Sequence, residues 1–451
     1  MQTTVVWCSK YDGIAYIANI CYNIPGDIML KVLKDSRYLY EIKDGKPEPF
    51  FWLGDTAWLL LQKLSLESVE KYFKNREERH YNVIQAVLVH DENFKDESLS
   101  VDLSNPSAAA SYWAKTAAVT ELAAKYGIYM AWLPVWGSMV KKGYLTNDNA
   151  KPYAEFLSER LGGYDNIVWV LGGDIRGEVG FEIWNIMGRE LKNRCPDKLV
   201  SFHPFGRTIS ANWFKDDLLD FDMFQSGHRR YDQASLGEWD DNKENEGFFG
   251  EDNWRYVRKR LGENPNKPVL DGEPSYEGIH HGLHDFSQPM WEAKDVRRYA
   301  YWSVFEGACG HTYGANSIMQ FYSLGDTECS YDAREFWQDG IELPGGRQMA
   351  YLYELMNSVD FASGEHDDRI ISNTGFEKHD RITAFSGKGF ALIYNYSGRP
   401  FRINAKHFES AEWFDPASGK RAKADIDPSA DIIPPINSGG ETDMVLVLRG
   451  V

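Results

Sequence analysis

The stretch Lys267-Pro-Val-Leu-Asp-Gly-Glu273-Pro-Ser-Tyr-Glu277 has the pattern of a short buried strand that ends at an acidic residue. Val269 and Leu270 supply the apolar run. Gly272 lets the backbone turn, and Pro274 removes the next amide donor. The strand is therefore expected to end near Glu273 and to present its carboxylate at the carboxyl edge of a sheet.

A second segment of the same kind lies upstream, Asn166-Ile-Val-Trp-Val-Leu-Gly-Gly-Asp174. Here too an apolar run breaks at glycines and delivers one acid. The two segments together predict a pair of carboxylates, Asp174 and Glu273. The alternative for either acid is structural, because acidic residues also cap the turn or helix that follows a strand.

Strand-like and helix-like segments alternate through most of the chain. Apolar runs predict eight strands, at residues 50–53, 82–89, 127–135, 166–171, 199–202, 221–224, 268–270 and 307–312. Amphipathic patterns predict helices between them, at residues 67–79, 111–126, 153–161, 181–193, 252–261, 291–305 and 333–357, whereas the linker 210–219 is short. Eight such units are typical of an α/β fold of the (β/α)8 TIM barrel class. An open doubly wound sheet is the alternative, but no GxGxxG motif follows the first strand.

The two ends of the chain have different patterns. Residues 1–27 form an N-terminal extension to which no structure is assigned, and residues 28–50 alternate as a hairpin expected at the bottom of the barrel. After residue 358 the pattern changes to short strands separated by turns, at 381–385, 389–396, 401–408, 411–414 and 443–448. The sequence therefore predicts a catalytic barrel over residues 28–358 and an all-β sandwich over 359–451.

Composition excludes several classes of partner. The 451 residues carry a net charge of −18 with no basic cluster, which argues against nucleic acid and anionic membranes. No apolar run is long enough to span a membrane, and no signal peptide is readable at the N-terminus. The five cysteines lack the spacing of a metal site or disulfide framework, so neither a metal nor another cofactor is expected. The 15 Trp and 25 Tyr provide flat faces on which sugar rings stack, although large cores also use them.

In a barrel the carboxyl ends of the strands line the active site. The polar and aromatic residues at those positions are the candidates for substrate binding: Asp55, Trp58, His90, Trp136, His203, Gln225, His228, Tyr276, His311 and Tyr313. Structural alternatives remain open, because Asp55 could instead anchor a turn and each histidine could be a satisfied core residue. Glu277 and Glu306 are expected as hydrogen-bonded supports. His280, His281 and His284 resemble a metal cluster, but no ligand carboxylate has the matching spacing.

Five motifs stand out together: Trp52-Leu-Gly-Asp-Thr-Ala-Trp58, Gly172-Gly-Asp174, Asp271-Gly-Glu-Pro-Ser-Tyr-Glu277, Pro344-Gly-Gly-Arg-Gln-Met349 and Trp413-Phe-Asp-Pro-Ala-Ser-Gly419. They resemble the apiosidase-like glycoside hydrolases, in which a small β domain follows the barrel. The resemblance implies a retaining hydrolase with Asp174 as acid/base and Glu273 as nucleophile. It also implies a periplasmic or extracellular protein that acts on apiose-containing or related branched plant glycans. One departure from the broader barrel glycosidases is that the fourth strand ends in Gly-Gly-Asp rather than Asn-Glu.

The predicted function is an exo-acting retaining glycosidase that uses two carboxylates. Long loops at residues 231–247 and 278–288 favour a closed pocket over the open cleft of an endo-acting, cellulase-like enzyme. A third hypothesis is a non-catalytic carbohydrate-binding barrel. A raised pKa on one acid would distinguish an enzyme from such a binding protein, because a binding site has no need for a protonated carboxyl group near neutral pH.

Overall fold

A curled parallel sheet forms the centre of the fold. The computed structural model describes residues 29–90, 101–215, 217–231, 248, 250–373, 377–405 and 407–451. Six parallel strands are hydrogen-bonded in the order β12-β4-β5-β6-β7-β8, namely β12 (Gly310–Tyr313), β4 (Trp52–Thr56), β5 (Val83–Val87), β6 (Tyr129–Leu133), β7 (Ile167–Ile175) and β8 (Val200–Pro204). A second sheet pairs β10 (Asp222–Gln225) in parallel with β11 (Val269–Asp271) and antiparallel with the short β9 (Thr208–Ile209).

Hydrogen bonds also connect the two sheets at both of their edges. Beside β8, the amide of Asp220 donates to the Val200 carbonyl at 2.8 Å, and Ser201 Oγ donates to the Phe221 carbonyl at 2.8 Å. Beside β11, the amide of Cys309 donates to the Val269 carbonyl at 3.0 Å. All eight predicted parallel strands are therefore present and follow one another around the curl.

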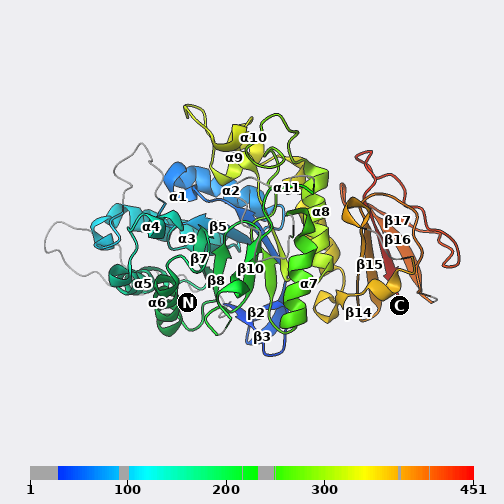
Figure 1. Cartoon of the computed structure of the whole chain (residues 1–451), viewed down its shortest axis with the longest axis horizontal. Coiled ribbons are helices and arrows are strands. Elements are labelled where there is room, and N and C mark those ends of the chain that lie inside the picture. The colour runs from blue at the N-terminus through cyan, green and yellow to red at the C-terminus, as the bar shows by residue number, and fades with distance from the viewer. Residues whose placement is uncertain are drawn as a thin grey trace, which may run out of the picture.

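Helices cover the outside of the curled sheet (Figure 1). The longer ones are α2 (Leu66–Glu77), α3 (Ala110–Lys125), α5 (Asn147–Leu161), α6 (Phe181–Arg194), α7 (Asn253–Glu263), α8 (Ala293–Phe305) and α11 (Pro344–Asn357). Shorter ones are α1 (Leu60–Lys63), α4 (Ser138–Lys141), α9 (Asn316–Met319) and α10 (Trp337–Gly340). No helix of the described residues has the length and apolar character needed to cross a membrane.

The single helix predicted over residues 333–357 is wrong in one respect. The structure divides it into α10, which ends at Gly340, and α11, which begins at Pro344. Proline lacks an amide hydrogen and fits a helix best in its first turn, so Pro344 starts a new helix. In the linker 210–219, the described residues (210–215 and 217–219) contain a single 3-10 helix, Ser210–Asn212.

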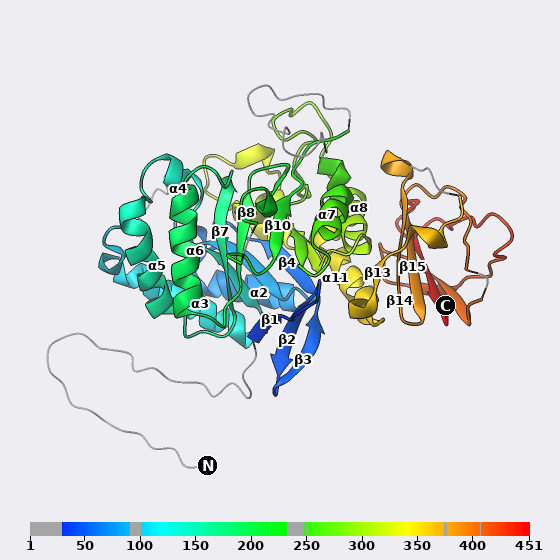
Figure 2. The ribbon, with the colours of Figure 1, turned by 60° about the horizontal axis from the view of Figure 1, so that its bottom comes forward.

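An N-terminal antiparallel sheet lies at the end of the curled sheet where the parallel strands begin. It consists of β1 (Met29–Val32), β2 (Leu39–Lys43) and β3 (Lys46–Phe50), seen below the parallel strands in Figure 2. Tyr129, the first residue of β6, donates its hydroxyl to Glu41 Oε1 at 2.9 Å, and its ring packs edge-on against Phe50. Residues 29–50 thus form antiparallel strands below the parallel ones, in the segment where the hairpin was expected, while residues 1–27 lie outside the described part of the chain.

The C-terminal part is a separate antiparallel β domain. Its six strands have the order β13-β14-β15-β18-β16-β17, namely β13 (Glu365–His366), β14 (Ile382–Gly387), β15 (Phe390–Asn395), β18 (Met444–Arg449), β16 (Ser410–Phe414) and β17 (Arg421–Lys423). The strand predicted at 401–408 is wrong: the described residues form only isolated bridges there, from Ile403 to Ile371 and from Phe401 to Ile432. Residues 434 and 435 after Ile432 are prolines, which cannot donate to a ladder. This irregular second layer and the regular sheet enclose a core of their own.

Helix α8 lies between the curled sheet and the β domain (Figure 1). Its Tyr301 stacks on Tyr394 of β15 with ring centroids 4.7 Å apart. Its Arg297 forms a fully buried ion pair with Asp443, at 2.9 and 2.8 Å from the two carboxylate oxygens. A buried charge of this kind is stable only while its partner stays in place, so the interface depends on both sides.

Candidate active site

Glu273 lies two residues after the end of β11 and is 5% exposed. Its Oε2 lies 3.2 Å from His203 Nε2 on β8, and its Oε1 lies 3.3 Å from His228 Nε2 in the loop after β10. The backbone amide of Tyr276 donates to His228 Nδ1 at 3.4 Å, so Nε2 carries the proton and points at the carboxylate. Burial would raise the pKa of Glu273, but the two histidines hold that pKa down at about 2. Glu273 is therefore an ionised carboxylate at neutral pH.

A bulge at the end of β7 presents Asp174. Gly172 pairs with His203 and Ile175 pairs with Pro204, so Gly173 and Asp174 between them have no partner on β8. Three consecutive residues have positive φ, 91° at Gly172, 99° at Gly173 and 46° at Asp174. A Cβ at Gly172 would lie 2.3 Å from the His203 carbonyl oxygen, which explains why this position requires glycine. Bulges and left-handed non-glycine residues of this kind cluster at functional sites.

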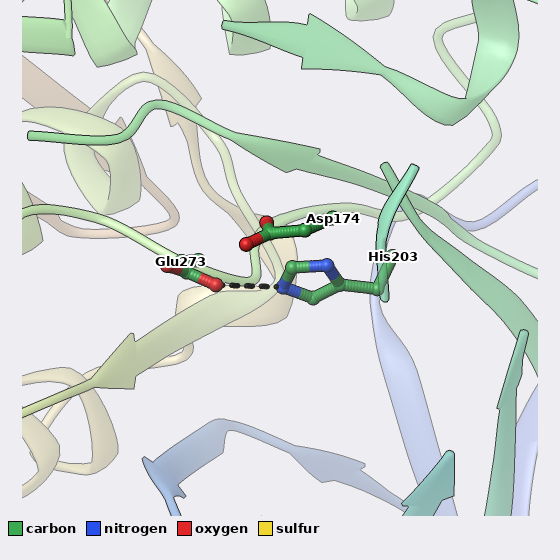
Figure 3. Close-up of side chains that lie close together, drawn as sticks. All are labelled: Asp174, His203 and Glu273. Carbon is green, nitrogen blue, oxygen red and sulfur yellow. Dashed lines mark ion pairs between the residues drawn. The ribbon is translucent and has the colours of Figure 1, made fainter. Parts of the chain in front are cut away.

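The two acids face each other across the end of the sheet, with His203 beside them (Figure 3). One ligand atom of each of Asp174, His203 and Glu273 lies within 4.8 Å of the other two. Burial and the Glu273 charge raise the pKa of Asp174 to about 7, while the nearby His203 and Gln225 act in the opposite direction. The site therefore holds one protonated and one ionised carboxyl group at mildly acidic pH.

Aromatic side chains form a wall beside the acids. Trp58 lies 5.2 Å from Trp136 and 5.2 Å from His203 between ring centroids, and His90 stacks on Trp136 at 5.4 Å. Tyr276 packs edge-on against His228, with ring centroids 4.8 Å apart. Two buried oxygens nearby, Asp174 Oδ1 and Gln225 Oε1, have no hydrogen-bond partner among the described residues. Buried polar atoms of this kind are usually satisfied, and in an active site substrate hydroxyls are suitable partners.

Twelve site residues were predicted, and the structure brings nine of them together. These are Asp174, Glu273, Trp58, His90, Trp136, His203, Gln225, His228 and Tyr276. Asp55 is a correction, because it is fully buried and pairs with Arg76 and Tyr72 of α2 at 2.5 Å each. Tyr313 is another correction, since its hydroxyl donates to Glu277 rather than to the site. Asp55 and Tyr313 are neighbours in register and share the face of the sheet that packs against helices.

His311 is the third correction. It is fully buried in β12, and burial lowers the pKa of its imidazole to about 3. His311 lies two residues before Tyr313 in the strand, so both side chains are on the face that packs against helices. His311 therefore does not line the site.

Glu277 and Glu306 are supports, as predicted. The carboxylate of Glu277 accepts hydrogen bonds from the amides of Gly345 and Gly346 at the start of α11, which explains the Pro-Gly-Gly motif. Glu306 at the end of α8 pairs with Arg258 and Arg381.

Asp271 is a support that the sequence pattern left unidentified. It is fully buried two residues before Glu273, and burial raises the pKa of its carboxyl group to about 7. Ser226 Oγ donates to it at 2.7 Å, and Asn253 Nδ2 at 3.3 Å. The Asp-Gly-Glu motif shows in the sequence that Asp271 lies close to Glu273. Its partners Ser226 and Asn253 are distant in the chain, and no motif connects them to Asp271.

The histidines at 280, 281 and 284 make separate contacts. His280 pairs with Asp332 at 3.0 Å, His281 packs on Trp291 at 3.8 Å, and His284 lies near Tyr331. Among the residues that the structure describes, the group that could hold a metal is instead Asp174, His203 and Glu273. Two carboxylates and an imidazole are suitable ligands for a divalent ion such as zinc.

Two family models match the chain. Residues 33–363 match the family model "Apiosidase-like, catalytic domain", and residues 366–449 match the model "Putative collagen-binding domain of a collagenase". A search of curated proteins finds no match.

Two solved structures cover nearly the whole chain. One, described as a glycoside hydrolase, is 38% identical, covers 94% of this chain and 97% of its own, and has a TM-score of 0.85. The other, a glycoside hydrolase family 5 protein from Bacteroides vulgatus, is 36% identical, covers 93% of each chain, and has a TM-score of 0.85. The chain therefore belongs to the apiosidase-like glycoside hydrolases and is an enzyme that hydrolyses O-glycosidic bonds in carbohydrates.

Proposed function

We propose that the enzyme is a retaining, exo-acting glycosidase of plant-type glycans, with Asp174 as general acid/base and Glu273 as nucleophile. The observation that carries this proposal is the close pair of carboxyl groups. Oxygens of the two acids lie within 4.8 Å of each other. Retaining enzymes have carboxyl groups about 5–5.5 Å apart, whereas inverting enzymes need roughly 6.5–9.5 Å to admit a water molecule.

In the first step the Glu273 carboxylate attacks the anomeric carbon while the bond from that carbon to the leaving oxygen breaks. Asp174 gives its proton to the leaving oxygen. The negative charge of Glu273 disappears as the glycosyl ester forms, and with it one of the two causes of the raised pKa of Asp174. Asp174 is then a carboxylate that removes a proton from water, and the resulting hydroxide attacks the anomeric carbon and releases Glu273.

The opposite pKa shifts of the two acids support a catalytic role over sugar binding alone. A binding site has no need for a carboxyl group that remains protonated up to pH of about 7, as Asp174 does. His203 and His228 keep the nucleophile ionised, and the wall of Trp58, His90 and Trp136 offers faces on which a sugar ring can stack.

Exo action is supported by the loop at residues 278–288. The amide of Gly282 in this loop donates to the carbonyl of His228 at 2.9 Å, so the loop covers the Glu273 side of the site. An endo-acting enzyme needs a cleft that is open at both ends. The other long loop, 231–247, lies almost entirely outside the described residues. For the sugar, apiose-containing or related branched plant glycans are the proposed substrates, because the catalytic family is apiosidase-like.

We also infer that the eight parallel strands close into one (β/α)8 barrel and that the chain divides at residue 358 into this barrel and a β-sandwich. The hydrogen bonds at both seams between the two sheets support closure. The separate apolar core of the C-terminal strands supports the division.

The test of the function is hydrolysis of a panel of plant oligosaccharides, with the anomer of the first product read by NMR. A product of retained configuration is expected, and an inverted one would overturn the mechanism. E273A should abolish turnover of every substrate. D174A should spare substrates with good leaving groups, and added azide should then yield a glycosyl azide of retained configuration. Equal slowing of good and poor leaving groups by D174A would remove the acid role from Asp174.

Metal-independent chemistry is part of the proposal, because two carboxylates suffice for it. Dialysis against a chelator should leave kcat unchanged. If activity were lost and a single divalent ion restored it, Asp174, His203 and Glu273 would be identified as metal ligands, and the roles assigned to them here would be wrong.

A further inference from the structure

The loop that carries His228, residues 226–231, is held firmly at its inner end. We call this segment the His228 loop. Ser226 Oγ donates to Asp271 Oδ2 at 2.7 Å, and Ser275 Oγ donates to the carbonyl of Gly227 at 2.9 Å. Asp271 and Ser275 flank the nucleophile in the sequence. The inner end of the loop is therefore tied to the same strand end as Glu273.

The outer end of the His228 loop rests on Glu251, which is 2% exposed. The amide of Tyr231 donates to Glu251 Oε2 at 2.6 Å, and the Tyr231 hydroxyl donates to the backbone carbonyl of Glu251 at 3.0 Å. A Cβ at the preceding Gly250 would lie 2.9 Å from the carbonyl oxygen of Gly227. The backbone at 250–251 therefore packs directly against the loop, with no room for another side chain.

The other oxygen of Glu251 binds residues from two further elements. Its Oε1 accepts from Arg298 Nη2 of α8 at 2.9 Å and lies 2.6 Å from Nε2 of His379, in the 3-10 turn Lys378–Asp380 of the β domain. The ring of His379 also packs against Tyr231, with centroids 5.3 Å apart. Glu251 is thus the point at which the loop, α8 and the β domain meet.

The charges around Glu251 keep it in the form that these contacts need. Burial would raise the pKa of its carboxyl group, but His379 and Arg298 hold the pKa below its ordinary value. An ionised carboxylate accepts hydrogen bonds at both oxygens, one toward the loop and one toward the β domain.

We propose that Glu251 is a positioning residue through which His379 of the β domain holds the His228 loop in register with the nucleophile. The inference rests on the proposed role of Glu273. It gives the β domain a direct part in the geometry of the active site, in addition to its contacts with α8.

The interface offers a matched control at Glu306. This glutamate is also 2% exposed, and it pairs with Arg381 of the β domain at 2.7 Å and with His366 of the β domain at 3.4 Å. Among the described residues its ionic partners are Arg258, His366 and Arg381, and none of them belongs to the His228 loop. E306Q and E251Q each remove one buried charge between the two domains. A difference between them in kcat or in pH profile therefore reports the effect of Glu251 on the His228 loop.

The experiment compares full-length wild type, E251Q, H379A and E306Q, with an aryl glycoside of the sugar that the wild type releases as substrate. Misplacement of a support far from the reacting atoms can cost up to about a hundredfold, and we expect kcat to fall roughly tenfold in E251Q and less in H379A, with KM changed less than about twofold. E306Q should retain the wild-type kcat.

Two readouts separate positioning from loss of stability. The groups that face Glu273 are His203, His228, Asp174 and Tyr276, and displacement of His228 removes one that lowers its pKa. The acid limb of kcat/KM should therefore move to higher pH by roughly one unit in E251Q and remain in place in E306Q. In the free enzymes, the ring 15N shifts of His228, assigned with H228Q, should lose the hydrogen-bonded signature in E251Q.

Each outcome decides the inference. If E251Q and E306Q lose stability equally and share one pH profile and one His228 spectrum, Glu251 is only an interface residue and the proposal is wrong. The NMR measurement needs no substrate, so it tests the positioning even if no sugar in the panel is hydrolysed. Activity of the wild type with unchanged His228 signals in E251Q would refute the positioning alone and leave the proposed function intact.

Discussion

The two acids of the site differ in environment more than in chemistry. Asp174 is buried near a negative charge, which raises its pKa to about 7, whereas two histidines hold the pKa of Glu273 at about 2. The proposed mechanism needs Asp174 protonated and Glu273 ionised. Activity should thus be high between these values, fall as pH rises through about 7, and fall again toward pH of about 2. A pH profile of kcat/KM checks this, and a basic limb well below 6 would contradict it.

The coupling between the acids can be measured without turnover. Because the Glu273 charge is one of the two causes that raise the pKa of Asp174, E273Q should lower that pKa. Carboxyl 13C NMR of the free enzyme reports the change, with D174N to assign the signal. An unchanged Asp174 titration in E273Q would mean that burial alone sets its pKa.

Asp55 provides a stability prediction. D55N leaves Arg76 buried without its charged partner, and breaking a buried pair in this way costs about 3–5 kcal/mol of unfolding free energy. The KM of the folded fraction should stay at the wild-type value, because Asp55 faces α2 and not the site. Denaturant unfolding and substrate kinetics check both statements. D55N/R76M should recover part of the loss, whereas a raised KM in D55N would restore the substrate-binding role.

The residues that the sequence misassigned share one physical reason. Asp55, His311 and Tyr313 lie at strand ends, but side chains alternate between the two faces of a strand. Only the structure shows whether the odd-numbered or the even-numbered residues of a strand face the site. The prediction was correct for Glu273, Asp174 and His228, because these residues lie beyond the last regular strand pairs. His203 is near the end of β8 and lies on the inner face.

At the scale of elements, the eight strands were predictable because buried parallel strands are continuous apolar runs. The break before α11 and the irregular segment at 401–408 follow from prolines whose effect depends on their neighbours. The bulge in β7 was not predictable in detail, since a pair of glycines permits many conformations and only packing against His203 and Trp136 selects one.

That bulge carries a prediction about Gly173. A Cβ there would lie 2.7 Å from Trp136 Cε3, so G173A must displace either the aromatic wall or Asp174. We expect kcat to fall by roughly a hundredfold, as misplacement of a catalytic group does.

Gly45 in the turn between β2 and β3 is the matched control for G173A. It also has a positive φ, 73°, but nothing lies within 4 Å of its Cβ position. G45A should cost only about 1–2 kcal/mol of stability from backbone strain and leave kcat unchanged. Equal activity of G173A and G45A would show that the bulge tolerates a side chain and does not fix Asp174.

At the scale of the whole molecule, the β domain completes the core around α8. Tyr301 and Phe305 of α8 pack on Tyr394 and Phe385 of the β domain. A chain truncated after Asn357 should expose these rings and lose its soluble, folded form, as measured by the soluble fraction and near-UV circular dichroism. A truncated chain that is folded and fully active would exclude a supporting role for the domain.

A milder variant keeps the domain and tests its buried ion pair. D443N removes the fully buried one of the two carboxylates that pair with Arg297 and leaves the more exposed Glu441 in place. Because Glu441 still pairs with Arg297, the expected loss of unfolding free energy is smaller than the roughly 3–5 kcal/mol of a buried charge that has no partner, and the fold is retained. Denaturant unfolding of the full-length chain measures it.

The two unpaired residues in β7 also bear on how such sites change in evolution. An aspartate is one methylene shorter than a glutamate, and here the bulge adds two residues, Gly173 and Asp174, that have no partner on β8. A longer side chain and a longer strand end are thus two ways to bring a carboxyl group to the same place. A lineage that replaces the acid with the longer residue would have to shorten the strand end at the same time. Substitution and deletion at this position are therefore expected to occur together.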